Sequence, residues 1–267
     1  MSHRLRVTNV SCAIKDHTVV SGVTFEVPAG SSCAIVGVNG SGKTTLLRAL
    51  SGVTQPATGE VLIDDHRLHR LRPKQRARLL ALVGQEEVLQ PDLTVAEVVA
   101  LGRLPYARAW ELGGKATQAY VEKALRQVHM YEYRDRVCEQ LSGGQRRLVI
   151  LARALAQDTG LIVLDEPTNH LDVKHQLGLL DILLETGKTV IASVHDLDLA
   201  LSRFDNVVLL ANHTMAACGP SHEVLTPKRL AEHFSVHGFV VQPAECEHRH
   251  LIIDHTIADK LGKGDCH

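Results

Sequence analysis

The sequence is poor in aromatic residues, lacks long apolar runs and carries almost no net charge. Only 3% of its 267 residues are Phe, Trp or Tyr, so few rings are available to stack on a ligand. No apolar run approaches the roughly 18 residues of a membrane span, so any membrane role must come through a partner. The net charge of −1 gives no general footprint for nucleic acid, whose phosphates are neutralised by Lys and Arg.

The cysteines and the first residues exclude two further classes of protein. Six cysteines are scattered along the chain, at positions 12, 33, 138, 218, 246 and 266. In a cytosolic chain we expect reduced thiols at such spacings, not a disulfide framework. The first ten residues, MSHRLRVTNV, contain no apolar segment typical of a secretory signal. The length suffices for one large α/β unit or two compact subdomains.

Strand-like and helix-like patterns divide the chain into an α/β core and a helical block. Strands are predicted at 5–10, 18–27, 32–36, 79–85, 161–167, 189–196 and 206–212, with a hairpin at 59–68. From about 88 to 157 the periodicity is helical, and Thr94 with Glu97 three residues later forms a capping box. Since helical segments separate the later apolar strands, we expect parallel β units with a helical subdomain inserted between them.

A glycine-rich loop at 37–45, GVNGSGKTT, fits the pattern G-x-x-x-x-G-K-[ST] in full. Its glycines allow successive backbone N–H groups to turn toward phosphates, and the helix that follows adds its positive N-terminal end. Lys43 can reach the β- and γ-phosphates, while the Thr44 hydroxyl can bind Mg²⁺. A strand precedes the loop and a helix follows it, which is the context that this motif requires.

Polar residues follow three other predicted strands. Asp165 and Glu166 end LIVLDEP, Gln85 follows ALVG, and His195 follows TVIASV. Ligands of open α/β sheets bind at the carboxyl ends of the strands, so we expect these side chains to meet Lys43 at one edge. There Asp165 can hold Mg²⁺ through water, and Glu166 can polarise the attacking water. Taken alone, Gln85 or His195 would more often be structural.

A second glycine-rich stretch, LSGGQRR at 141–147, has no lysine. Ser142 precedes two glycines and a strongly helical segment, so it is expected near a helix N-terminus whose N–H groups are free for an anion. From the residues alone, an ordinary capped helix is an equally good interpretation.

Taken together, GVNGSGKTT, Gln85, LSGGQ, LIVLDEP, NHLD and His195 resemble the ATP-binding cassette (ABC) ATPase family over residues 1 to about 240. The resemblance implies a P-loop NTPase core at 1–87 and 158–240, with an N-terminal antiparallel β subdomain. It also implies an α-helical subdomain at 88–157 and a C-terminal tail at 241–267. In this family two cassettes pair head to tail, with each ATP between the phosphate loop of one and the LSGGQ loop of the other.

The resemblance assigns roles to individual residues. ATP and Mg²⁺ are the implied cofactors, with Thr44, Gln85 and Asp165 around the metal and Glu166, Gln85 and His195 in catalysis. His195 would touch the γ-phosphate, and Asp172 would lie in a loop that crosses the dimer interface. Residues assigned to the nucleotide are Gly37, Asn39, Gly40, Ser41, Gly42, Lys43, Thr44 and Thr45 of the chain's own loop, and Ser142, Gly143, Gly144 and Gln145 for the partner's ATP.

Within the family, the segments at 92–106, 151–176 and 193–210 look like the ATPase subunits of iron–siderophore, haem and vitamin B12 importers. This similarity implies a peripheral subunit on the cytoplasmic face of the membrane, docked on a permease dimer that an extracytoplasmic binding protein supplies. The permease's coupling helix would enter a groove lined by Gln85 and residues 88–110. The alternative is a non-transport ABC ATPase, such as a soluble scaffold of iron–sulfur cluster assembly.

Two features depart from the family pattern or remain open. Ile14 stands where the family usually stacks an aromatic residue on adenine, so we expect weaker adenine discrimination and a site that accepts GTP. In the tail, CEHRH at 246–250, His255, Cys266 and His267 suggest metal ligands. Their spacing matches no standard zinc pattern, and a solvated tail with incidental His and Cys is the alternative.

Overall fold

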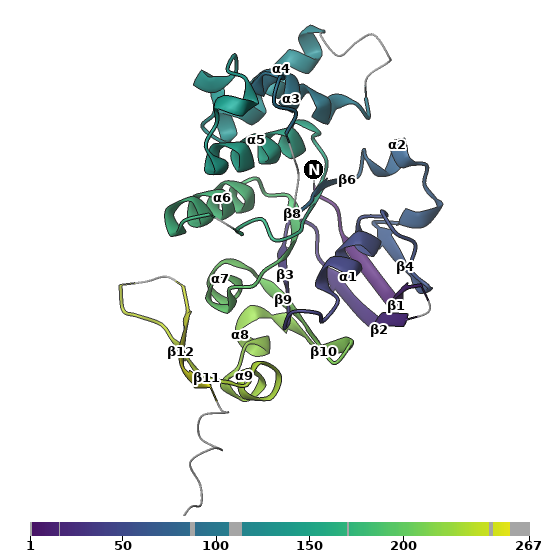
Figure 1. Cartoon of the computed structure of the whole chain (residues 1–267). Coiled ribbons are helices and arrows are strands. Elements are labelled where there is room, and N and C mark those ends of the chain that lie inside the picture. The colour runs from purple at the N-terminus through teal and green to yellow at the C-terminus, as the bar shows by residue number, and fades with distance from the viewer. Residues whose placement is uncertain are drawn as a thin grey trace, which may run out of the picture.

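The computed structural model describes residues 2–15, 17–85, 89–106, 114–169, 171–245 and 248–256. Within them, ten strands form one sheet in the order β5-β4-β1-β2-β10-β9-β3-β8-β7-β6, and β11 and β12 form a separate pair. The helices gather around the central strands, and α3, α4 and α5 lie together at one end of the molecule (Figure 1).

The first half of the ten-stranded sheet is antiparallel. Its strands are β1 (Leu5–Ile14), β2 (His17–Val27), β4 (Thr58–Ile63) and β5 (His66–Arg67). β1 pairs with both β2 and β4, and β4 and β5 form the hairpin predicted at 59–68. The N-terminal antiparallel β region that the family resemblance implies is therefore present.

The other half of the sheet, from β9 to the edge strand β6, is parallel, as the alternation of strands and helices predicts. Its strands are β3 (Ser32–Val36), β6 (Leu80–Val83), β7 (Leu161–Leu164), β8 (Thr189–Ser193) and β9 (Asn206–Ala211). β9, β3, β8, β7 and β6 neighbour one another in that order, all parallel. β10 (Thr214–Pro220) runs antiparallel to β9 and touches β2 through the pair Thr214 and Ser21.

The helices are mostly short. They are α1 (Lys43–Leu50), α2 (Pro73–Arg76), α3 (Val95–Ala100), α4 (Lys115–Gln127), α5 (Gly143–Ala156), α6 (Val173–Glu185), α7 (Leu197–Arg203), α8 (Ser221–Val224) and α9 (Pro227–Phe234). Single 3₁₀ turns lie at Leu68–Arg70, Leu101–Arg103, Tyr131–Tyr133 and Cys138–Gln140. The structure confirms Thr94 as the N-cap of α3: its hydroxyl accepts from Glu97 N while Glu97 caps Thr94 N. None of these helices combines the length and the apolar character needed to cross a membrane.

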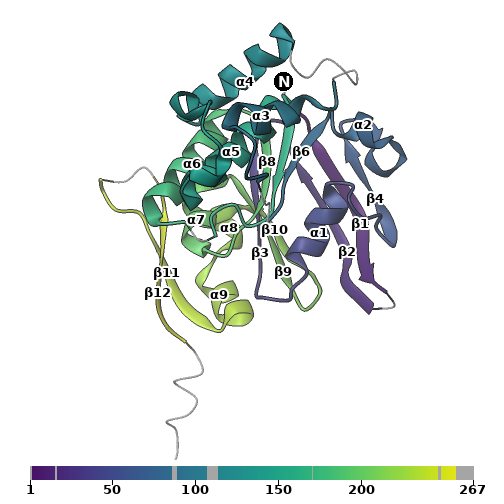
Figure 2. The same cartoon turned by 45° about the horizontal axis from the view of Figure 1, so that its top comes forward.

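Two apolar cores lie on opposite faces of the central strands. Alternate residues of a strand point to opposite faces, so Cys33 and Ile35 of β3 join one core while Ala34 and Val36 join the other. The first core fills the space between the antiparallel strands, α1 and the central sheet (Figure 2). The second lies under α3 to α7 and α9. Both cores fix the strands whose carboxyl ends carry the predicted site.

The region after β10 shows no clear sequence pattern, yet its described part, up to residue 256, contains further helices and strands. β11 (Val236–Val241) and β12 (His250–Thr256) pair as an antiparallel hairpin. β11 packs on α9, and β12 packs on α7. The hairpin contains Gly238, where a Cβ atom would come within 2.8 Å of the Leu230 side chain. The strand accepts glycine there because α9 lies too close for a larger residue.

Candidate functional site

The loop between β3 and α1 is shaped for phosphate. Gly42 has φ of 96°, and a Cβ there would come within 2.2 Å of Val20 Cγ2. Ser41 Oγ is buried and has no hydrogen-bond partner among the described residues. A buried hydroxyl without a partner is costly unless a ligand or water satisfies it. The loop therefore presents an unmet polar atom where the sequence predicts a phosphate.

Lys43 is held within this loop. Its Nζ donates to the carbonyl oxygens of Gly37 (2.8 Å) and Val38 (3.2 Å), and the side chain is buried. Burial lowers the pKa of Lys43, and the nearby carboxylates of Glu166 and Asp165 act in the opposite direction. An arriving phosphate would likewise favour the charged form. Asn39 and Gly40 are exposed at the tip of the loop, and Thr45 lies in the first turn of α1.

Asp165 lies at the carboxyl end of β7, beside α1. Thr44 Oγ1 donates to Asp165 Oδ1 at 3.3 Å, and Ser193 Oγ donates to the same oxygen at 2.7 Å. Hydroxyl and carboxylate oxygens are the donors that Mg²⁺ prefers. A cavity of about 290 Å³ opens beside them, lined by Thr44, Leu47, Arg48, Val53, Leu82, Gly84, Gln85 and Asp165. Thr44 and Asp165 would therefore fit an Mg²⁺ ion bound together with a nucleotide.

Glu166 is the centre of a hydrogen-bonded cluster. Its carboxylate accepts from Gln85 Nε2 (2.5 Å) and from the side chain of Asn169, and it pairs with the His195 ring. The Glu166 backbone has φ of 50°, a left-handed conformation that costs a non-glycine residue about 1–3 kcal/mol. Its N–H donates to Ser193 Oγ at 2.7 Å, which holds the backbone in place.

The expected meeting of strand ends is confirmed. β3, β6, β7 and β8 deliver Lys43, Gln85, Asp165 with Glu166, and His195 to one edge of the sheet. Their catalytic and metal-binding roles remain predictions.

The sequence reasoning missed Ser193 and Asn169. Ser193 is fully buried and links Asp165 to the Glu166 backbone. A serine within the apolar run TVIASV was the available signal for Ser193. Asn169 lies in the TNHLD run next to Glu166, where the order of residues alone does not show that its side chain turns back.

The LSGGQ turn is a capped and exposed helix N-terminus. Ser142 Oγ accepts from Gln145 N at 3.3 Å, and Gln145 Oε1 accepts from Ser142 N at 3.0 Å. Ser142 and Gly143 are exposed, and a Cβ on Gly143 would meet no atom within 4 Å. Gly144 lies against the His175 side chain. Among the described residues, the side-chain hydrogen bonds of this turn stay within it, so the predicted contact with a second ATP is geometrically open.

Arg147, in the first half of α5, was not predicted. Its guanidinium donates to the carbonyl oxygens of Gln85 (2.6 Å) and Gly84 (3.4 Å). The helix that begins at the LSGGQ turn is therefore tied to the residue whose side chain contacts Glu166. An arginine in a helix-forming run gives no sequence signal of such a link.

Two further predicted residues lie at the surface. Ile14 ends β1 and is 54% exposed, so an adenine ring could reach it, but its contact with adenine remains a prediction. Asp172 caps α6 and accepts from His175 N at 2.9 Å, a bond that lowers the pKa of the Asp172 carboxyl. Its side chain is largely exposed, as a residue at a dimer interface would be before the dimer forms.

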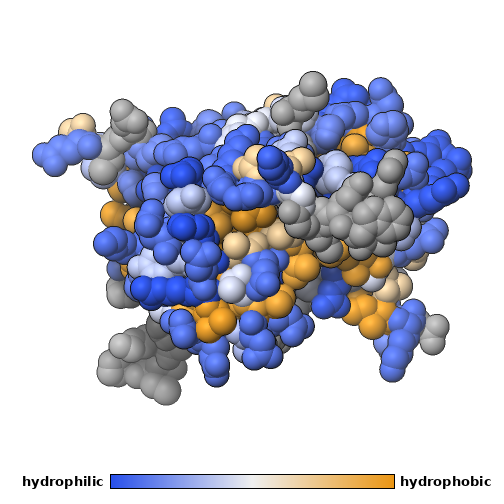
Figure 3. Space-filling view, turned by 90° about the horizontal axis from the view of Figure 1, so that it is seen from above, coloured by the Kyte–Doolittle hydropathy of each residue, from blue (hydrophilic) through white to orange (hydrophobic). Residues whose placement is uncertain are grey.

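A groove lies between α3 and α4, at the end of the molecule shown in Figure 3, where apolar side chains are exposed among polar ones. Its volume is about 460 Å³. The apolar part of its lining comprises Ala96, Ala100, Val121, Leu125 and Tyr131. Of the predicted permease-contacting stretch 88–110, residues 89–106 are described, and the rest lies outside the described residues.

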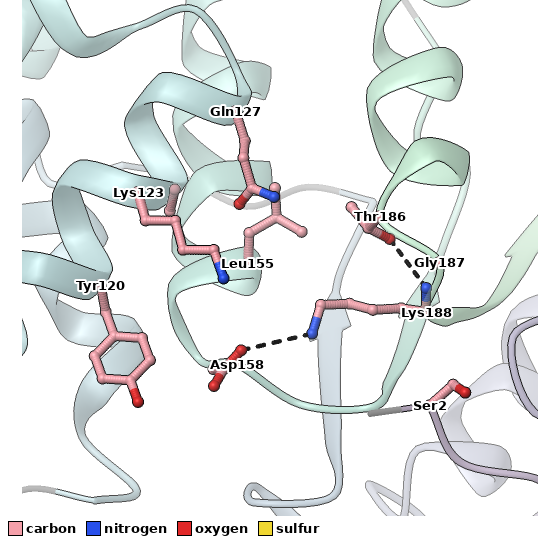
Figure 4. A pocket seen from close by; sticks show the side chains of 10 residues that line it. Ser2, Tyr120, Lys123, Gln127, Leu155, Asp158, Thr186, Gly187 and Lys188 are labelled. Atoms are coloured by element: carbon pink, nitrogen blue, oxygen red, sulfur yellow. Dashed lines mark hydrogen bonds and ion pairs between the residues drawn. The ribbon is translucent and has the colours of Figure 1, made fainter.

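Another cavity, of about 400 Å³, lies away from the phosphate loop (Figure 4). It is lined by α4, the end of α5 and the turn before β8, where the strands begin and not where they end. Lys188 faces Asp158 across it at 3.9 Å and donates to the Thr159 carbonyl. This cavity contains none of the predicted site residues.

The suggested metal ligands of the tail fall mostly outside the described residues. Positions 246–247 and 257–267 lie there, and only the backbone of His255 is described. Among the described residues no cluster of three or more His, Cys, Asp or Glu side chains could hold a metal.

Comparison with known proteins gives a consistent picture. A family model for the ABC transporter matches residues 20–169. The chain is 34% identical to the petrobactin import ATP-binding protein FpuD of Bacillus anthracis, over 88% of this chain and 87% of the relative. It is 34% identical to the ferric enterobactin transport ATP-binding protein FepC of Escherichia coli, over 89% of each. The hemin import ATP-binding protein HmuV of Rhodopseudomonas palustris is 36% identical over 84% of this chain and 85% of the relative.

Solved structures share the fold. A chain from an inward-facing metal-chelate type ABC transporter superposes with a TM-score of 0.82 at 24% identity, covering 95% of this chain and 98% of that one. A dimeric ATP-binding cassette with bound ADP and phosphate superposes with a TM-score of 0.71 at 27% identity, covering 82% and 99%.

Proposed function

This chain belongs to the ABC transporter family of ATP-binding proteins and hydrolyses ATP to drive transport, and we propose that it powers an importer of iron–siderophore complexes or related metal chelates. The observation that carries the proposal is the convergence of Lys43, Asp165, Glu166 and His195 at one sheet edge, in a chain similar to chelate importers along most of its length. Haem and cobalamin belong to the same proposed class of cargo.

Substrate binding follows from the phosphate loop. The N–H groups of the loop and of the first turn of α1 surround the phosphates, and Ser41 Oγ gains the partner that it lacks. Lys43 can exchange its carbonyl contacts for phosphate oxygens, which neutralise its charge better in a buried position. Mg²⁺, held by Thr44 and through water by Asp165, would neutralise charge on the β- and γ-phosphates.

Hydrolysis needs a carboxylate beside the γ-phosphate. Glu166 has the position for it, and Gln85, Asn169 and His195 fix its two oxygens. In the proposed cycle His195 and Gln85 turn toward the γ-phosphate and the metal, which frees a Glu166 oxygen to accept a proton from the attacking water. The present arrangement would then be the resting one, with the base held by its own neighbours.

ABC ATPases dimerise and pair with permeases. We propose a head-to-tail homodimer in which the exposed N-terminus of α5 caps the γ-phosphate bound by the partner. Ser142 and Gly143 are exposed, and a Cβ on Gly143 would meet no atom of the described residues within 4 Å. Lysine is not needed there, because Lys43 of the partner subunit already contacts the same phosphates. On the membrane side, a groove between the α/β core and the helical block, lined by Gln85 and the stretch 88–110, would receive the permease's coupling helix at the cytoplasmic face. An extracytoplasmic binding protein would supply the permease, and the α3–α4 groove shares only Ala96, Glu97 and Ala100 with that stretch.

The test is recovery of the complex. Affinity-tagged chain, extracted from membranes in mild detergent, is expected to bring down a multi-span membrane protein with matching stoichiometry. Cells that lack the gene should lose uptake of a radiolabelled ferric siderophore, haem or cobalamin, and wild-type chain but not Glu166→Gln should restore it. Recovery only with soluble iron–sulfur assembly proteins would reject the importer and favour the scaffold alternative.

A further inference from the structure

The C-terminal hairpin β11–β12 lies beyond the residues 20–169 that match the family model, yet it contacts the segment that carries His195. β8 ends at Ser193, His195 follows two residues later, and α7 begins at Leu197. β12 packs directly against α7 (Figure 2). The position of His195 therefore depends on how α7 is held.

The polar part of the contact between the hairpin and α7 centres on one carboxylate, that of Asp198. Asp198, in the first turn of α7, accepts from Leu251 N at 2.7 Å with Oδ1 and pairs with His250 Nδ1 at 3.2 Å through Oδ2. Leu251 is buried in the larger apolar core, so the backbone N–H that Asp198 receives is fixed in place. Both oxygens of Asp198 are thus used by β12.

Hydrogen bonds join the first turn of α7 to Asp196, the residue that follows His195 in the chain. Asp196, the residue after His195, caps α7 and accepts from Asp198 N (2.8 Å) and Leu199 N (3.1 Å) through Oδ1. Ser202 Oγ donates to the Asp198 carbonyl at 2.7 Å, one turn further on. Displacement of the first turn of α7 would therefore move Asp196 and, with it, the backbone of His195.

We propose that Asp198 is a positioning residue for ATP hydrolysis, which holds His195 against Glu166 by clamping the start of α7 to β12. The inference rests on the catalytic role proposed above for His195. It gives the C-terminal hairpin a function in turnover without any contact with nucleotide. Since the phosphate loop is not part of the clamp, the step affected is the chemistry and not the binding of ATP.

The test compares steady-state hydrolysis by full-length variants. Asp198→Ala is expected to lower kcat roughly tenfold, because misplacement of a catalytic group by about 1 Å can cost up to about 100-fold. KM for ATP should stay within about twofold of wild type. Asp198→Asn keeps an acceptor for Leu251 N and should recover most of the loss. Equal kcat for wild type and Asp198→Ala would overturn the clamp.

Two further variants separate positioning from stability. Asp181→Ala removes the bond between Asp181 and Arg203 (2.8 Å), which tethers the other end of α7, so it should lower thermal stability without lowering kcat. In a His195→Ala background, Asp198→Ala should have little additional effect, since the two act through one group. If the kcat losses of His195→Ala and Asp198→Ala multiply in the double variant, the proposal is rejected. It is also rejected if Asp181→Ala lowers kcat as much as Asp198→Ala does. Normal turnover in His195→Ala would reject the role of His195 itself, and the clamp with it.

Discussion

The most constrained residue of the site is Glu166. It is buried, its backbone is left-handed, and three side chains from three segments compete for its two oxygens. Such a conformation persists only where its surroundings enforce it. Ser193, which bonds both the Glu166 backbone and Asp165, provides that enforcement from the neighbouring strand. Glu166 and Asp165 are thus aligned by one hydroxyl.

Ile14 makes a prediction at the same scale. Ile14→Tyr should tighten ATP binding, because base stacking on an aromatic ring contributes about 1–3 kcal/mol. The effect should be larger for ATP than for GTP if the wild-type site discriminates poorly. Titration of both nucleotides into wild-type and variant protein measures it, with Ile14→Leu as a control for apolar contact. Unchanged ATP affinity in Ile14→Tyr would show that the ring does not reach the base.

At the scale of elements, α3 and α5 each begin with a capping box, but the two helix N-termini have different predicted roles. α3 begins with Thr94 and Glu97, and α5 begins with Ser142 and Gln145. Ser142→Ala and Thr94→Ala should each cost about 0.5–2 kcal/mol of unfolding free energy. Only Ser142→Ala should also abolish ATP-dependent dimerisation and turnover of the isolated subunit. Loss of turnover in both variants would mean that the α5 cap acts through stability alone.

The phosphate loop offers a second matched pair. Gly40 and Gly42 have φ of 81° and 96°, but only a Cβ on Gly42 would collide with Val20. Gly40→Ala loses stability only through its unfavourable backbone conformation, whereas Gly42→Ala loses about 1–3 kcal/mol more through overpacking. In urea unfolding of nucleotide-free protein, the midpoint of Gly42→Ala should therefore lie well below that of Gly40→Ala. Equal midpoints would show that Val20 moves aside freely.

Much of this fold could be predicted because its signals are local. The parallel strands, the capping box at Thr94 and the phosphate loop follow from short patterns, and the carboxyl ends of parallel strands must meet at one edge. The contacts of Arg147 and Asn169 could not be predicted. Arg147 bonds to Gln85, which lies far away in the sequence, and Asn169 reaches Glu166 only because the chain turns sharply between them. β11 was not predicted because Gly238 interrupts its strand-like pattern. The glycine is there because α9 lies close to it, which only the tertiary structure reveals.

At the scale of the whole molecule, the exposed LSGGQ turn and the exposed tip of the phosphate loop lead us to predict a dimer that forms only with ATP. Glu166→Gln should bind ATP, hydrolyse it at least about 100-fold more slowly, and accumulate as a dimer. Gel filtration with ATP and Mg²⁺ checks this, and the same variant with ADP serves as the control. Near-normal turnover would remove Glu166 as the catalytic base.

The ten-stranded sheet is continuous in order, but among the described residues the ladder between β2 and β10 is short: Ser21 pairs with Thr214 and donates its N–H to the His213 carbonyl. Besides this short ladder, the antiparallel strands are joined to the rest through the apolar core that they share with α1 and the central strands. Native-state hydrogen exchange should therefore resolve two cooperative units, with amides of β1 and β2 opening at lower free energy than those of β3 and β8. ATP that contacts Ile14 with its base and Lys43 with its phosphates would hold the two units together. Their amides would then open with the same free energy, as one cooperative unit.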